Sequence, residues 1–239
     1  MQILVTGVNS HIAIDICNFF IKKKHSVFGT YYLKQNNLIN LSNKCKLIKM
    51  NLLKLRLEDL PKNIDMIIHV AAETNHNNKN IYSINFNCSK NIFNYAKKFN
   101  CKKFIFFSTT SIEYEENNDE KKQYILSKKK AEKYFKNKGV KVISLRLPSI
   151  LSPKLNQSLW FSKLNKKIFL NKEIEVYNSD SYTNHFIYYK DITKFIGKIS
   201  FLKKIKNYDE INLCSTGKIK IIEIINMMKR KYKSNSKVK

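Results

Sequence analysis

Tyr124 and Lys128 are the pair of side chains with the clearest capacity for chemistry. They are four residues apart, so a helix would place them about 6 Å apart along its axis and on one face. A positive charge within about 4–6 Å favours the ionised form of a phenol, so we expect Lys128 to lower the pKa of Tyr124 toward neutrality. Thr109, at the end of an apolar run, would hydrogen-bond the same substrate oxygen. Such a trio exchanges a proton with a hydroxyl or carbonyl group.

The spacing of this pair is a weak indication by itself. Lysine and arginine together make up 45 of the 239 residues, so chance matches are common. The alternative is a half-buried helical tyrosine beside a solvated lysine. The pair indicates a catalytic site only if elements elsewhere in the chain form a dinucleotide-binding site.

The first residues of the chain have the pattern of a phosphate-binding turn. Residues 3–5 are wholly apolar, as in a strand buried on both faces, and an amphipathic helix is predicted to follow. A helix N-terminus offers free N–H groups and partial positive charge to a pyrophosphate. Ser10 and Ala13 occupy two of the three positions where glycine is expected, and Ser10 is small enough to keep the site plausible. We expect a dinucleotide to contact Gly7, Asn9, Ser10, His11 and Ile12.

The end of the second predicted strand, residues 27–31, bears on the choice of dinucleotide. An acidic residue there would bind the adenosine 2′-hydroxyl of NAD. Thr30, Tyr31 and Tyr32 occupy this region and Lys34 follows. Because no carboxylate would repel a 2′-phosphate, the sequence favours NADP(H) over NAD(H).

Predicted strands and helices alternate through the first 150 residues. Strands are expected at residues 46–50, 66–70, 104–107 and 141–146. Alternation predicts an α/β fold of the Rossmann type, a doubly wound and mainly parallel sheet with helices on both faces. Ligands of such sheets bind beyond the carboxyl ends of the strands. His69 lies inside an apolar strand, so we interpret it as a hydrogen-bonded core residue rather than a catalytic base.

The pattern loosens beyond Pro153. We expect residues 1–150 to form the dinucleotide-binding domain and residues 151–232 a small substrate-binding region with segments returning to that domain. A short strand is expected at residues 174–176, and residues 113–122 should be a solvent-facing loop with solvated carboxylates. The last residues, 233–239, are lysine-rich and serine-rich and are predicted to be a disordered basic tail.

Composition limits the other classes of function. The formal net charge of +27 comes almost wholly from dispersed lysines, and the few arginines argue against a nucleic-acid site. Five cysteines without a C-x-x-C pair fit free thiols in a reducing compartment and no metal site. No signal peptide and no membrane span are expected, so the protein should be soluble and cytoplasmic.

Several segments, in order, resemble the extended short-chain dehydrogenase/reductases of the NAD-dependent epimerase/dehydratase type. They are Thr6-Gly7…Ala13, His69-Val70-Ala71-Ala72, Asn85…Asn91, Phe106 to Thr109, Tyr124…Ser127-Lys128, Arg146 to Ser149, Phe186-Ile187-Tyr188…Asp191 and Asn212-Leu213. The resemblance implies NAD or NADP across the strand ends and a sugar substrate, nucleotide-linked, in the carboxyl-terminal region. It also implies hydride transfer with Tyr124 as acid and base, and a homodimer, an assembly common in the family.

The resemblance further implies which residues hold the cofactor. Lys128 would bind the nicotinamide ribose, and Thr109 would orient the reacting oxygen. Besides the phosphate turn, the expected cofactor contacts are Tyr31, Asn51, Leu52, Val70, Ala71, Ala72, Asn85, Ser108, Tyr124, Lys128, Leu147, Pro148 and Ser149.

Departures from the family pattern narrow the expected reaction. Thr110-Ser111 follow Thr109 where dehydratases carry Asp-Glu, which argues against 4,6-dehydration. Asn184-His185 stand where many members clamp the diphosphate with an arginine, so His185 or a nearby lysine would have to replace it. We therefore expect a sugar epimerase or reductase. A catalytically inactive dinucleotide-binding regulator of the same fold is the alternative, and an RNA-associated protein is a weaker third reading.

Overall fold

The computed structural model describes the chain except for residues 34–37, 115–118, 137, 153–159 and 203. It divides into two compact units, Met1–Leu147 with Tyr189–Leu213, and Pro148–Tyr188 with Cys214–Lys239. Lys34, the centre of the predicted loop at 113–122, and Pro153 lie outside the described residues.

The first unit is built on one seven-stranded sheet with the order β10-β6-β5-β4-β1-β2-β3. Every neighbouring pair of strands is parallel, which confirms the predicted Rossmann-type sheet. The order reverses between β1 and β4, and ligands of such folds bind at this point. The strands are β1 Gln2–Thr6, β2 Ser26–Tyr31, β3 Lys46–Lys49, β4 Met66–His69, β5 Lys103–Thr109, β6 Lys141–Leu147 and β10 Tyr208–Asn212.

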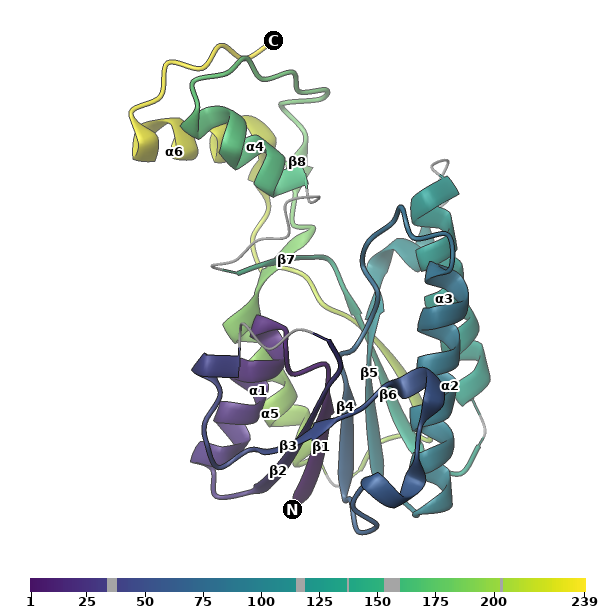
Figure 1. The fold of residues 1–239 in the computed structure, drawn as a ribbon. Coiled ribbons are helices and arrows are strands. Elements are labelled where there is room, and N and C mark those ends of the chain that lie inside the picture. Colours follow the sequence, from purple (N-terminus) through teal and green to yellow (C-terminus); the bar gives the residue numbers. More distant parts are fainter. Residues whose placement is uncertain (34–37, 115–118, 137, 153–159, 203) are drawn as a thin grey trace. The chain divides into compact units, whose positions relative to one another are not determined.

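Helices cover both faces of this sheet (Figure 1). α1 (His11–Lys22) and α5 (Tyr189–Ser200) cover one face, and α2 (Ile81–Lys98) and α3 (Asp119–Phe135) cover the other. Because the central strands are buried on both faces, their inner residues are mostly apolar, and Ile3, Leu4 and Val5 of β1 are completely buried. Short 3₁₀ turns connect the elements: η1 Leu38–Asn40, η2 Leu52–Lys54, η3 Leu57–Asp59 and η4 Thr110–Glu113.

Two contacts fix α5 against the rest of the unit. Gly197 lies over the ring of Phe19 on α1, and a Cβ at that position would come within 2.5 Å of the ring. At the end of α5, the buried ammonium of Lys103 donates to the carbonyls of Ile199 and Ser200, both at 2.8 Å. A cation there satisfies carbonyl groups that have no intrahelical partner.

α3 begins at Asp119, five residues before the predicted start at Tyr124. The predicted solvent-facing loop at 113–122 is therefore wrong in two respects. Lys121, Lys122 and Gln123 are good helix formers and lie in the helix. Glu113 ends the turn η4 and forms an ion pair with Arg146 at 3.0 Å instead of being merely solvated.

The second unit contains two short strand pairs and two packed helices. β7 (Ser149–Leu151) pairs in parallel with β9 (Phe186–Tyr188), and β8 (Tyr182–Thr183) pairs antiparallel with β11 (Ile219–Lys220). α4 (Trp160–Phe169) packs on α6 (Ile221–Tyr232). The core of the unit is formed by Leu164, Ile168, Ile174 and Ile225.

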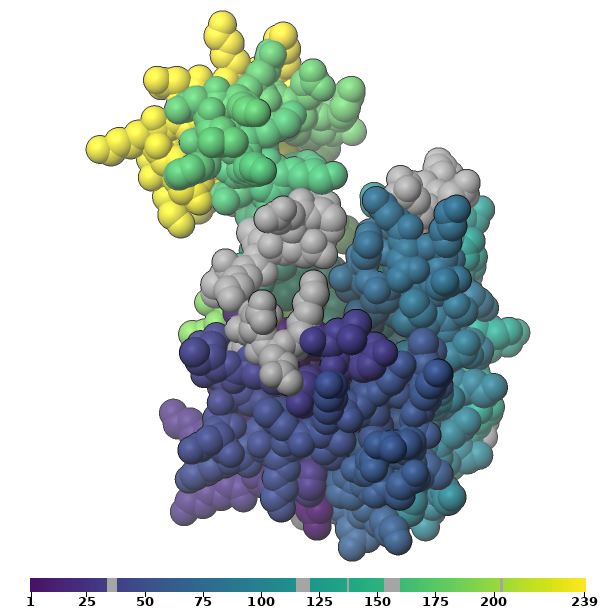
Figure 2. Space-filling view, viewed as in Figure 1, coloured from purple at the N-terminus to yellow at the C-terminus, as the bar shows by residue number. Residues whose placement is uncertain are grey.

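The carboxyl-terminal segment of the second unit is ordered, contrary to the predicted disordered tail at 233–239. The N–H of Ile174 donates to the carbonyl of Lys237 at 2.9 Å, and the N–H of Val176 donates to that of Lys239 at 3.0 Å. Ser236 is buried, and Val238 packs on the core. The predicted strand at 174–176 is reduced to a single bridge between Ile174 and Val238. Figure 2 shows green atoms of this unit beside yellow atoms of the carboxyl-terminal part of the chain.

Candidate functional site

The phosphate turn has the close backbone approach that a dinucleotide site requires. Gly7 has a φ of +73°, and a Cβ on it would come within 2.8 Å of the Cα of Ala71. Ser10 caps α1, because its hydroxyl accepts from the N–H of Ala13 at 3.3 Å and donates to the carbonyl of Gly7 at 3.1 Å. The N–H groups of His11 and Ile12 are in the first turn, where helices leave them without an intrahelical partner. These donors suit a pyrophosphate.

A directed chain of hydrogen bonds fixes the end of β4 beside this turn. The N–H of Ala71 donates to the hydroxyl of Thr6 at 3.2 Å, and that hydroxyl lies 2.8 Å from Nδ1 of His69. Nε2 of His69 lies 3.0 Å from the hydroxyl of Ser89, which itself donates to the carbonyl of Asn85 at 2.7 Å. Because Ser89 spends its hydrogen on Asn85, Nε2 of His69 carries a proton and donates to Ser89, and in a neutral ring Nδ1 then accepts from Thr6.

Burial lowers the pKa of His69 to about 3, in agreement with this neutral ring. The interpretation of His69 as a satisfied core residue is thus confirmed. Its part in the site is indirect, since it supports the backbone at Ala71 that faces Gly7.

The remaining predicted cofactor contacts in the first unit lie at strand ends. The carbonyl of Tyr31, at the end of β2, accepts from the N–H of Met50 at 2.8 Å. Asn51 caps η2 by accepting from the N–H of Leu53 at 3.0 Å, and Leu52 is buried. Val70, Ala71 and Ala72 follow β4 directly.

Asn85 holds the segment after β4 in place. Its side-chain oxygen accepts from the N–H of Glu73 at 2.7 Å, and its nitrogen donates to the carbonyl of Glu73 at 3.0 Å. Asn85 is buried on α2. Both ends of its amide thus support backbone, and its expected contact with a cofactor stays a prediction.

The structure brings Tyr124 and Lys128 together on α3. The Lys128 ammonium is buried, donates to the carbonyl of Phe107 at 2.8 Å and lies 5.6 Å from the centre of the Tyr124 ring. It also lies 4.7 Å from the centre of the Phe106 ring. The two side chains therefore share one face of the helix, as the spacing predicts, beside the end of β5.

The expected direction of the Tyr124 pKa is wrong. Burial raises the pKa of Tyr124 to about 12, and burial lowers the pKa of Lys128 to about 7. Desolvation penalises the charged form of each group, and here it outweighs the attraction between ammonium and phenolate. The carboxylate of Glu132, one turn further along α3, acts in the opposite sense and raises the pKa of Lys128.

Thr109 is the last residue of β5, and its hydroxyl is oriented by a hydrogen bond. Its oxygen caps η4 by accepting from the N–H of Ser111 at 3.2 Å. The hydroxyl hydrogen is thereby left to donate, which suits the oxygen of a sugar hydroxyl or keto group. Ser108 is buried in the preceding position. Leu147, paired with Thr109 across the sheet, ends β6, whereas Pro148 and Ser149 belong to the second unit.

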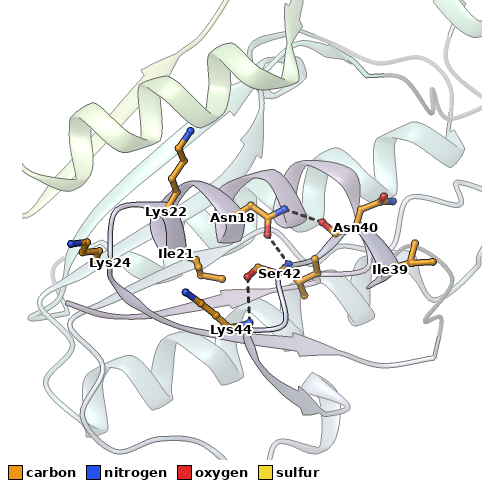
Figure 3. Close-up of a pocket in the computed structure, with 9 residues that line it drawn as sticks. Asn18, Ile21, Lys22, Lys24, Ile39, Asn40, Ser42 and Lys44 are labelled. Atoms are coloured by element: carbon orange, nitrogen blue, oxygen red, sulfur yellow. Dashed lines mark hydrogen bonds between the residues drawn. The ribbon is translucent and has the colours of Figure 1, made fainter.

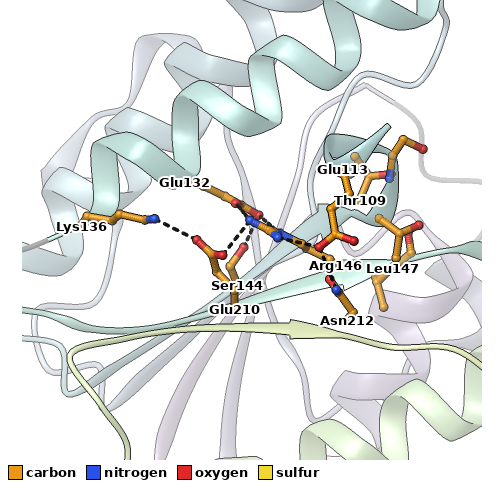
Figure 4. A network of polar contacts seen from close by, with 11 residues as sticks. Thr109, Glu113, Glu132, Lys136, Ser144, Arg146, Leu147, Glu210 and Asn212 are labelled. Atoms are coloured by element: carbon orange, nitrogen blue, oxygen red, sulfur yellow. Dashed lines mark hydrogen bonds and ion pairs between the residues drawn. The ribbon is translucent and has the colours of Figure 1, made fainter. Parts of the chain in front are cut away.

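Two features near this site were missed by reasoning from the sequence. The ring of His76 contacts that of Tyr124 edge to face, with centroids 5.4 Å apart. Arg146 binds the carboxylates of Glu113, Glu132 and Glu210 at 3.0, 2.6 and 2.9 Å (Figure 4). The signal for the second was present, because arginine is rare in this lysine-rich chain and Arg146 lies within a family segment.

A separate hollow of about 540 Å³ lies beside the carboxyl-terminal half of α1. Asn18 shapes it by donating to the carbonyl of Asn40 and accepting from the N–H of Ser42, both at 2.9 Å (Figure 3). Lys22, Lys24 and Lys44 line it. It lies at the opposite end of α1 from the phosphate turn and takes no part in the site described above.

Comparison with known proteins identifies the family of this chain. Residues 3–214 match the family described as "NAD dependent epimerase/dehydratase family". The chain belongs to this family. An uncharacterized UDP-glucose epimerase of Bacillus subtilis (strain 168), YtcB, is 25% identical over 261 residues, which cover 95% of this chain and 81% of that protein.

Solved structures show the same fold. A UDP-glucuronic acid 4-epimerase from Bacillus cereus in complex with NAD has a TM-score of 0.85 at 20% identity, over 100% of this chain and 85% of that one. A UDP-N-acetylglucosamine 4-epimerase from Methanobrevibacter ruminantium M1, in complex with UDP-N-acetylmuramic acid, has a TM-score of 0.81 at 22% identity, over 100% and 84%. These likenesses confirm the extended short-chain dehydrogenase/reductase fold.

The described residues contain neither a membrane-spanning helix nor a metal-binding cluster. None of the helices in the described part of the chain has the length and apolar character needed to cross a bilayer. Within the described ranges, no group of three or more His, Cys, Asp or Glu side chains is arranged so that it could hold a metal ion.

Proposed function

We propose that this protein is an NAD(H)-dependent epimerase that acts on a nucleotide-linked sugar. The observation that carries the proposal is the gathering of Tyr124 and Lys128 beside the end of β5, in the same unit as a phosphate turn. The family match and the UDP-sugars after which the relatives are named support an epimerase over other oxidoreductases.

The residues of the first unit fit the adenosine and pyrophosphate parts of NAD. Gly7 would let the pyrophosphate approach the backbone, and the first turn of α1 would supply N–H donors at His11 and Ile12. The small residues Ala71 and Ala72 would leave room beside the dinucleotide. Bound NAD would supply hydride acceptance and return at one sugar carbon.

The side chains of this chain would manage the proton. With its pKa raised to about 12, Tyr124 is a neutral phenol at pH 7 and must give up its proton to solvent before it can accept one from a sugar hydroxyl. The positive charge of Lys128, whose pKa of about 7 leaves it protonated in part of the molecules, would stabilise that phenolate. The hydroxyl of Thr109 would donate to the same sugar oxygen and orient it.

The choice between the two dinucleotides is a finer part of the proposal. The Bacillus cereus relative is described with NAD, which favours NAD(H). The preference for NADP(H), expected from the end of β2, stays a prediction. The same holds for the nucleotide, the sugar and the reacting carbon, for which position 4 of a UDP-sugar is the first choice because the relatives are 4-epimerases.

The test measures binding and turnover in parallel. NAD and NADP are titrated against the purified protein by calorimetry, and UDP-glucose, UDP-glucuronic acid and UDP-N-acetylglucosamine are each incubated with protein and NAD. We expect NAD to bind and one sugar nucleotide to be converted to its 4-epimer, detected by chromatography. NAD binding without turnover across a broad panel of sugar nucleotides would instead favour the dinucleotide-binding regulator.

A further inference from the structure

The short turn η4, which follows Thr109, is tied to the sheet through one arginine. Glu113 ends the turn, and its carboxylate binds the guanidinium of Arg146 at 3.0 Å and the side-chain amide of Asn212 at 2.8 Å. Arg146 lies opposite Ser108 on one side and Asn212 on the other in the sheet register. Figure 4 shows Glu113 and Thr109 close together, with Arg146 and Asn212 reaching the turn from neighbouring strands.

The guanidinium itself is held rigidly from the opposite side. Glu132, only 4% exposed, accepts from Arg146 through both carboxylate oxygens, at 3.1 and 2.6 Å. The hydroxyl of Ser144 donates to the same carboxylate at 2.6 Å. A two-point bond between guanidinium and carboxylate fixes orientation as well as position. Arg146 is therefore a stiff link between α3 and the turn η4.

We infer that Glu113 and Arg146 are positioning residues that set the hydroxyl of Thr109 toward the reacting oxygen. The turn η4 has only four residues, and its two ends are held by Thr109 as the cap and by Glu113 as the ion pair. Loss of the ion pair between Glu113 and Arg146 would free Ser111, whose N–H donates to the Thr109 oxygen and fixes that oxygen as an acceptor. The Thr109 hydroxyl would then lose its preferred direction, and a displacement of about 1 Å can cost a large factor in rate.

The same network reaches the other half of the site. Glu132 lies one turn beyond Lys128 on α3, and its negative charge raises the pKa of that lysine against the effect of burial. Arg146 thus connects α3, the helix that carries Lys128, with η4, the turn that Thr109 caps. This inference rests on the proposed function, because it assigns the network a part in that same reaction.

The kinetic test is a double-mutant cycle with Thr109→Ala, Glu113→Ala and the double variant. We expect Glu113→Ala to lower kcat about tenfold with little change in KM, and to have no further effect once Thr109 is alanine. Glu113→Gln keeps an acceptor for Arg146 and Asn212 and should recover most of kcat. Glu210→Ala is the matched control, because it removes another ion pair of Arg146, at 2.9 Å, without touching η4. Multiplicative effects of the two alanine substitutions would overturn the inference.

A second measurement does not depend on turnover. Hydrogen exchange of the backbone around residues 109–114 should be faster in Glu113→Ala than in the natural protein, and unchanged in Glu210→Ala. Equal exchange in Glu113→Ala and the natural protein would overturn the inference even if the enzyme is active. If no sugar nucleotide is converted at all, the proposed function fails, and hydrogen exchange alone decides whether Glu113 holds the turn.

Discussion

His69 takes up a proton far less readily in the folded chain than in the unfolded one. Burial lowers its pKa from 6.5 to about 3, so between these values only the unfolded chain is protonated at this residue. Stability therefore rises with pH through this window and is lost as pH falls from about 6.5 toward 3. The loss attributable to His69 is on the order of 5 kcal/mol, because one pKa unit corresponds to about 1.4 kcal/mol.

Urea unfolding of the natural protein and of His69→Gln at several pH values checks this prediction. Carboxylates titrate in both proteins, so the informative quantity is the difference between their unfolding free energies. That difference should shrink as pH falls below about 6.5. A difference that is constant with pH would show that folding does not lower the pKa of His69.

Gly7 combines an unusual backbone angle with a close contact. In Gly7→Ala, a Cβ would meet the backbone of Ala71 at 2.8 Å at a φ of +73°. We expect a loss of about 2–4 kcal/mol in the free energy of unfolding and of most NAD affinity. Gly139→Ala is the control, because Gly139 has a similar φ of +82° but nothing within 4 Å. It should lose only about 1 kcal/mol and keep NAD binding. Equal losses in the two variants, measured by urea unfolding and calorimetry, would contradict the account.

For single residues, the sequence predicts which side chains lie together better than it predicts their pKa values. The spacing of Tyr124 and Lys128 suffices to place them on one face of a helix. The pKa of each group depends on how much water the fold removes, which no local spacing contains, and so the expected direction for Tyr124 was wrong. Glu113 was assumed to be solvated because its ion partner, Arg146, lies 33 residues away in the chain.

At the scale of elements, Lys103 shows how a charged residue in a buried strand can be required. Its ammonium caps the carbonyls at the end of α5, so Lys103→Met would leave them without this donor while they are shielded from water. We expect a loss of about 1–3 kcal/mol in the free energy of unfolding. Lys102→Met, next to it, removes an exposed ion pair with Asp65 and should cost about 0–1 kcal/mol. Denaturant unfolding compares them, and similar losses would mean that the cap contributes little.

The carboxyl-terminal segment gives a second prediction at this scale. Deletion of residues 234–239 removes the carbonyls that accept from the N–H groups of Ile174 and Val176. It also removes Ser234, whose hydroxyl donates to the carbonyl of Ile168 at 2.7 Å. We expect hydrogen exchange at residues 174–176 to become markedly faster, while exchange in β5 of the first unit is unchanged. Unchanged protection at Ile174 would contradict the observed pairing.

The elements of the first unit could be predicted because their patterns are local. Buried parallel strands such as β1 and β5 are continuous apolar runs, and α2 has helical periodicity. The elements of the second unit are harder to predict from local patterns. The sequence of α4 contains several lysines, which leave a narrow apolar face, and the carboxyl-terminal segment is polar. Both are stabilised by contacts with α6 and Ile174 that lie far away in the sequence.

At the scale of the whole molecule, family membership rests on the order of many segments rather than on one motif. The matched region, residues 3–214, draws on both compact units. The chain is shorter than its relatives, since it spans 85% of the Bacillus cereus enzyme and 81% of YtcB. The expected homodimer stays a prediction, which light scattering of the purified protein would check.

The central claim is that Tyr124 is the acid and base of an NAD-dependent epimerisation. The most direct test is turnover of the converted sugar nucleotide by Tyr124→Phe at saturating NAD. The matched control is Tyr134→Phe on the same helix, because the Tyr134 hydroxyl donates to the exposed side chain of Asn94 at 2.8 Å. We predict that Tyr124→Phe binds NAD normally but loses at least about a hundredfold in kcat, while Tyr134→Phe keeps its activity. Undiminished turnover by Tyr124→Phe would contradict the account.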